Sequence, residues 1–86
     1  MELQRKIELN GKRYLVSVYP GLYPSIRIMP IEKEFRNGFV STGQRLYDGY
    51  KCDTEEDVAW HINKFKHLVA SNKLDVCRVI ELYDEG

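Results

Sequence analysis

The residues of this chain that could do chemistry are few and scattered. The residues that could take part in nucleophilic catalysis are Ser41, Thr42, Cys52, Asp53, His61 and Cys77. None belongs to a local catalytic motif, and a catalytic triad is recognised by its three-dimensional geometry rather than by composition. A small domain with one helix also offers little concavity for a substrate pocket. We therefore expect no catalytic residues and no enzyme activity.

The histidines and cysteines lack the spacing of a metal site. His61 and His67 are six positions apart, whereas two histidines that bind zinc from one helix are four apart. Neither Cys52 nor Cys77 belongs to a Cys-x-x-Cys pair, and we expect both thiols to be reduced. The segment Val40-Ser41-Thr42-Gly43 is neither a P-loop nor a dinucleotide fingerprint. We expect no metal and no cofactor.

One helix, from Thr54 to about Asn72, must position the two histidines. Its apolar residues recur at the spacing that aligns side chains on one helical face, and they are Val58, Ile62, Phe65 and Val69. Asp53 or Thr54 can accept hydrogen bonds from the unpaired N–H groups of the first turn, and Glu56 follows Asp53 at capping-box spacing. Asn72 can adopt the left-handed conformation that ends a helix. The apolar stripe predicts the face that packs on the rest of the protein.

Trp60 falls nearly opposite that stripe, at about 100° per residue. Its neighbours on the outer face are Glu56, Asn63, Lys64, His67 and Ser71. Tryptophan is enriched among the residues that anchor protein interfaces. The partner-binding residues that we predict are Glu56, Trp60, Lys64 and His67, and the predicted partner is another protein chain or a second copy of this one. The alternative is that another part of the same chain covers the indole: residues 20–24, residues 32–45 or the C-terminal tail.

The first eighteen residues predict a β-hairpin. Apolar and polar residues alternate on both sides of Asn10-Gly11, which supplies two residues that tolerate the positive φ of a type I′ turn. This turn would place Leu9 opposite Lys12 and Ile7 opposite Tyr14. The face that we predict to be core carries Leu3, Ile7, Leu9, Tyr14, Val16 and Val18.

Two more strands and a second hairpin are predicted before the helix. Ser25–Ile31 alternates, and Pro30 should limit this strand to an edge or an end of the sheet. Asn37-Gly38 predicts a hairpin that pairs Phe35 with Val40, and a mobile loop is the alternative. Gln44–Cys52 reads as a further strand, interrupted at Asp48-Gly49 by a bulge or a turn.

After the helix, Leu74–Tyr83 predicts a last strand with apolar residues on both faces. Together these elements predict one α+β domain over residues 1–86. Its architecture is an antiparallel sheet of four to five strands with one helix packed on a face, in the order ββββαβ. The chain is 43% hydrophobic and 30% charged, which is typical of a globular domain. It has no apolar run near the roughly 18 residues of a membrane span and no signal peptide, so we expect a cytoplasmic protein without membrane contact.

Two classes of function remain. The first is a non-catalytic protein-binding module, an accessory or inhibitor protein of the kind found in phages or mobile elements, which acts by occluding a partner. The second is nucleic-acid binding, because basic and aromatic residues interleave as they do in single-strand binders. The residues of this alternative are Arg36, Phe39, Arg45, Tyr47, Tyr50 and Lys51. Strands favour aromatic residues in any case, and the chain has no net charge, so the first class leads.

Overall fold

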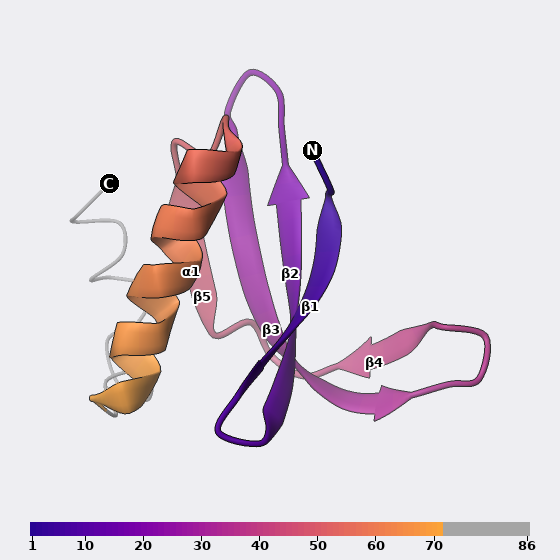
Figure 1. Cartoon of the computed structure of the whole chain (residues 1–86). Coiled ribbons are helices and arrows are strands. Elements are labelled where there is room, and N and C mark those ends of the chain that lie inside the picture. Colours follow the sequence, from indigo (N-terminus) through magenta and orange to yellow (C-terminus); the bar gives the residue numbers. More distant parts are fainter. Residues whose placement is uncertain (72–86) are drawn as a thin grey trace.

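The computed structural model describes residues 1–71, and every structural statement below concerns this part of the chain. Its elements are β1 (Gln4–Leu9), β2 (Lys12–Tyr19), β3 (Ser25–Glu34), β4 (Val40–Thr42), β5 (Tyr47–Tyr50) and α1 (Glu55–Ala70). The strands form one antiparallel sheet, and α1 lies across one of its faces (Figure 1). The predicted α+β class and the sheet-plus-helix architecture are confirmed. The predicted last strand, Leu74–Tyr83, lies outside the described residues.

The hairpin of β1 and β2 has the predicted register. Asn10 and Gly11 have φ angles of 53° and 80°, so both adopt the positive φ that the two-residue turn requires. Leu9 pairs with Lys12, and the register continues to Gln4 and Ser17. The prediction that Leu3 belongs to the core is wrong, because Leu3 is 47% exposed. The reason is that Arg5 already bonds Glu55 in the first turn of α1, so residue 3 lies beyond the end of the helix.

Strand β3 is longer than predicted and runs through Pro30 to Glu34. Its first part, Ser25–Ile28, pairs with β2 on one side and with β5 on the other, whereas Ile31–Glu34 pairs with β4. Pro30 therefore does not end the strand. It lies where β3 changes its partner from β5 to β4, and its carbonyl accepts a hydrogen bond of 2.9 Å from the Gly43 N–H. The missing N–H of proline is tolerated at such an interruption of the ladder.

The second hairpin, β3–β4, is confirmed, but its register differs by one residue from the prediction. Glu34, not Phe35, pairs with Val40. The Phe35 N–H donates to the Phe39 carbonyl over 2.9 Å, and Gly38 has a φ of 91°. This is the three-residue loop in which a left-handed glycine follows a turn, and it is one residue shorter than the loop we expected. The hairpin projects away from the part of the sheet that α1 covers (Figure 1).

Strand β5 contains Asp48 and Gly49 without a bulge or a turn, which corrects the prediction of an interruption. Gly49 pairs with Ile26 of β3. The requirement for glycine at this position comes from a side chain of α1. A Cβ atom at residue 49 would lie 2.6 Å from atoms of the His61 ring. Glycine is therefore needed because the imidazole packs directly on the backbone of β5.

The predicted helix and its N-terminal cap are confirmed. Thr54 is the N-cap, and the capping box forms with Asp57: the Asp57 N–H donates to the Thr54 hydroxyl, and the Asp57 carboxylate accepts from the Thr54 N–H. Asp57 thus takes the place that the sequence suggested for Glu56. The helix ends at Ala70 with Ser71 as its C-cap. Asn72, the predicted end, lies outside the described residues.

The core lies between α1 and the sheet. Val58 and Phe65 of the predicted apolar stripe are fully buried, while Ile62 and Val69 are partly buried against the same core. The Phe65 ring meets Tyr14 edge to face at a centroid distance of 5.0 Å. The remaining buried apolar residues are Val16, Val18, Ile26, Ile28, Tyr47 and Cys52. The stripe therefore faces the sheet, and the opposite side of α1 forms part of the molecular surface.

Candidate functional site

Trp60 lies on the outer face of α1, as its position in the helical period indicates. Its side chain is 57% exposed. Neither the loop at residues 20–24 nor the segment 32–45 buries it. The C-terminal tail, the third possible cover, lies outside the described residues. An indole with more than half of its surface exposed is uncommon in a folded domain, since large apolar side chains gain free energy when they leave water.

Two neighbouring side chains orient the Trp60 indole. The His61 ring meets it edge to face, with centroids 4.9 Å apart and an interplanar angle of 89°. From the next turn of the helix, the Lys64 Nζ atom lies 5.4 Å from the indole centroid, within the range of a cation–π interaction. The indole is therefore exposed and also supported by contacts on two sides.

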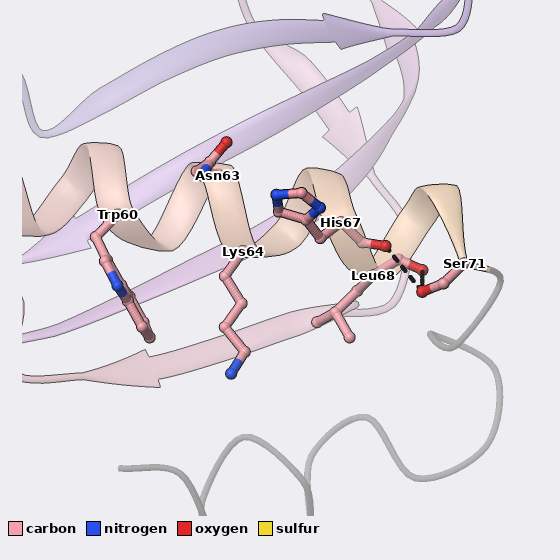
Figure 2. A pocket seen from close by; sticks show the side chains of 6 residues that line it. All are labelled: Trp60, Asn63, Lys64, His67, Leu68 and Ser71. Atoms are coloured by element: carbon pink, nitrogen blue, oxygen red, sulfur yellow. Dashed lines mark hydrogen bonds between the residues drawn. The ribbon is translucent and has the colours of Figure 1, made fainter.

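A surface hollow of about 390 Å³ lies beside Trp60. The residues that line it are Trp60, Asn63, Lys64, His67, Leu68 and Ser71. Figure 2 shows that three side chains spaced four residues apart point from α1 in the same direction: Trp60, Lys64 and Leu68. At the end of the helix the Ser71 hydroxyl donates to the His67 carbonyl over 2.8 Å and holds the last turn in place.

Three of the four predicted partner-binding residues, Trp60, Lys64 and His67, line this hollow. Glu56 is exposed in the first turn of α1 and does not line it. The hollow adds Asn63, Leu68 and Ser71, which were not predicted as site residues. Leu68 could have been found from its spacing, because it stands eight positions after Trp60 on the same side of the helix. We use the name "Trp60 face" for the six residues that line the hollow.

Beneath the Trp60 face, His61 belongs to a buried hydrogen-bond network. Its Nε2 atom lies 2.9 Å from the Tyr50 carbonyl, and its Nδ1 atom lies 2.6 Å from the Tyr47 hydroxyl. Because a carbonyl only accepts, neutral His61 carries its proton on Nε2, and Nδ1 accepts from the tyrosine. Burial lowers the pKa of His61 and favours this neutral form, although the bond to the Tyr50 carbonyl acts in the opposite direction.

Burial raises the pKa values of two groups near His61. Burial raises the pKa of the Cys52 thiol to about 11, so this thiol stays protonated at neutral pH and is a weak nucleophile. Burial also raises the pKa of Tyr47. Among residues 1–71, no cluster of three or more histidine, cysteine or acidic side chains is placed to hold a metal ion. The network around His61 supports the packing of α1 on β5.

The residues of the nucleic-acid alternative do not form one surface. Tyr47 is buried in the core and cannot stack on a base, which corrects its place in that set. The Arg45 guanidinium pairs with Asp48 at 3.1 Å. Arg36 and Phe39 lie in the loop of the β3–β4 hairpin, which projects away from β5 (Figure 1). Tyr50 and Lys51 lie at the end of β5.

Comparison with models of protein families, with curated proteins and with solved structures finds no match for this chain. In the part of the chain that the structure describes, no helix is both long enough and apolar enough to cross a membrane.

Proposed function

We propose that this protein is a non-catalytic protein-binding module and that the Trp60 face is its contact surface for another protein. The observation that carries the proposal is the exposed indole of Trp60, supported from within by His61 and from the side by Lys64. Tryptophan supplies large contact area at interfaces, and its truncation is often among the most costly for affinity.

The support of the indole favours binding for an entropic reason. A side chain that is already held by neighbours loses less conformational freedom when a partner covers it. The adjacent hollow, with Leu68 on its wall, can accept an apolar side chain of the partner beside the indole. Such a module acts by occupying a surface of its partner, as an accessory or inhibitor protein does.

Affinity capture from a lysate of the source cells tests the proposal. The tagged wild-type chain, Trp60→Ala and the matched control Tyr23→Ala are compared. Tyr23 is also an exposed aromatic residue, but it lies on the loop between β2 and β3 and not on α1. The proposal predicts a protein that the wild type and Tyr23→Ala retain and that Trp60→Ala loses. Once it has been purified, the captured protein should bind Trp60→Ala about 30-fold more weakly than it binds the wild type. This loss corresponds to about 2 kcal/mol of binding free energy.

Two controls make the experiment decisive. Nuclease treatment and moderate salt should leave the captured protein in place, because binding through nucleic acid falls steeply with salt. The melting midpoint of Trp60→Ala should match that of the wild type. Equal capture by all three baits, or a partner that is lost with nuclease, would contradict the proposed function.

A further inference from the structure

Among the strands that the structure describes, β1 lies at an edge of the sheet. It pairs only with β2 among the described strands. The Val18 N–H donates to the Leu3 carbonyl over 2.7 Å, so the backbone groups of the odd-numbered residues point toward β2. In an antiparallel pair the backbone groups of alternate residues point to opposite sides. The N–H and C=O groups of Gln4, Lys6 and Glu8 therefore point away from the sheet.

We propose that this edge binds the β1 edge of a second copy of the chain, antiparallel and around a two-fold axis at Ile7. Strand addition at a sheet edge is a common mode of association, and a two-fold interface requires a self-complementary surface. The sequence Lys6-Ile7-Glu8 meets this requirement. With the axis at Ile7, Lys6 faces Glu8 of the second copy, and Glu8 faces its Lys6.

The alternation of outward-pointing backbone groups along β1 is compatible with this register. Lys6 and Glu8 both present outward N–H and C=O groups, so the two Lys6–Glu8 pairs exchange four main-chain hydrogen bonds across the axis. Ile7 meets Ile7 of the second copy on the face that α1 covers. Ile7 and Leu9 are only partly buried at the rim of the core, so the second copy would bury more of their surface.

Charge selects this register over its neighbours. An axis at Lys6 would place the two Lys6 side chains opposite each other, and an axis at Glu8 would do the same for the two carboxylates. Like charges directly opposite in a sheet are destabilising. Charged residues at an edge usually discourage pairing, but the alternation of Lys6 and Glu8 makes one pairing favourable.

The tip of the β3–β4 hairpin lies near β1 without pairing with it. A hollow of about 650 Å³ separates the outer part of β1 from the tip of the β3–β4 hairpin. Its lining residues are Glu2, Gln4, Arg5, Lys6, Leu15, Gly38, Phe39 and Val40. The Lys6 ammonium lies 3.1 Å from an oxygen of Glu34 in β3, so its side chain reaches across β2. In the dimer, Lys6 would exchange this exposed ion pair for Glu8 of the second copy. Glu8 is exposed and has no ion-pair partner among residues 1–71.

Sedimentation equilibrium of the full chain, alone and as charge variants, tests the proposal. Wild type should form a dimer. Lys6→Glu places two carboxylates opposite each other in both halves of the dimer, and Glu8→Lys places two ammonium groups opposite each other. Each variant alone should therefore dimerise at least about tenfold more weakly. An equimolar mixture of the two variants should recover the dimer, because every facing pair in the mixed dimer is again of opposite charge.

Three controls separate this interface from effects on folding and from the Trp60 face. Lys66→Glu makes the same charge change as Lys6→Glu on an exposed helical position and should dimerise like the wild type. Trp60→Ala should also dimerise like the wild type, so the failure of one proposal leaves the other testable. The melting midpoint of each variant reports its fold. A wild type that stays monomeric at millimolar concentration, or two single variants that do not recover on mixing, would overturn the proposed dimer.

Discussion

The ring of His61 meets the ring of Trp60 edge to face at 4.9 Å, although the first side chain is buried and the second is exposed. The two residues are adjacent on α1, so the helix turns one inward and the other outward. His61 is held by the Tyr47 hydroxyl and the Tyr50 carbonyl, both from β5. The exposed indole thus rests on a side chain that the sheet itself positions.

The stability of the protein should fall as the pH decreases below the ordinary histidine pKa of about 6.5. Burial lowers the pKa of His61 in the folded state, so the unfolded chain binds more protons in this range, and the free energy of unfolding rises with pH. Urea unfolding at a series of pH values from 7.5 to 5 measures this slope. This pH range lies above the pKa values of the carboxylates. The pKa values of Glu55 and Asp57 are lowered in the folded state, so their contributions to the free energy of unfolding are lost only at more acidic pH.

The control for the pH series is a pair of glutamine variants. His61→Gln should be less stable at neutral pH and should show a reduced slope, whereas His67→Gln, at an exposed position, should retain the slope of the wild type. A slope that follows His67 instead would show that His61 is not the titrating group.

Gly49→Ala should destabilise the protein by about 1–3 kcal/mol, the usual cost of forcing an extra methyl group into a packed interior. The added Cβ would lie 2.6 Å from the His61 ring. Chemical denaturation measures the loss. The double variant Gly49→Ala/His61→Ala provides the check, because removing the ring relieves the clash and the two losses should be less than additive. Simple additivity would mean that the glycine serves β5 in some other way.

Truncation of Phe65 should remove much of the stability, by about 3–5 kcal/mol for Phe65→Ala. The ring is fully buried and meets both Tyr14 and Tyr47 edge to face, so alanine leaves a cavity between α1 and the sheet. Lys66→Ala, on the exposed side of the same turn, should be nearly neutral. An unchanged melting midpoint for Phe65→Ala would be incompatible with the packing of the helix described here.

Gly11→Val should cost about 1–2 kcal/mol or more, because a β-branched residue resists the left-handed conformation. Gly11 has a φ of 80°, and the space around its Cα is open, so the effect comes from the backbone alone and not from a clash. Thermal unfolding checks this, with Gly11→Asn as the control, since asparagine tolerates positive φ and should lose less. Equal losses for both substitutions would point to a different cause.

The elements that could be predicted from the sequence are those whose signals are local. Asn10-Gly11 specifies a turn by the φ angles of its own two residues, and α1 is marked by its cap and by the period of its apolar residues. The outward position of Trp60 follows from the same period. These features need no knowledge of distant contacts, and the structure agrees with each of them.

The features that were missed depend on neighbours far apart in the sequence. Asp48-Gly49 predicts an interruption of the strand, because the His61 ring that requires glycine at residue 49 comes from another element. Pro30 predicts an edge or an end of its strand, and the sequence does not show that β3 continues past it, because the change of partner from β5 to β4 depends on sheet topology. The burial of Tyr47 likewise depends on tertiary packing against α1. Aromatic residues of half-exposed and fully buried strands look the same in the sequence.

The most direct measurement of the central proposal uses the fact that Trp60 is the only tryptophan in the chain. The protein is labelled with fluorotryptophan, and its single fluorine NMR resonance is followed while the unlabelled captured partner is added. We expect a resonance that is sensitive to solvent in the free protein and that shifts and becomes shielded from solvent on saturation with the partner. A resonance that is already shielded in the free protein, or that stays unchanged when the partner is bound, would show that Trp60 does not form the binding surface.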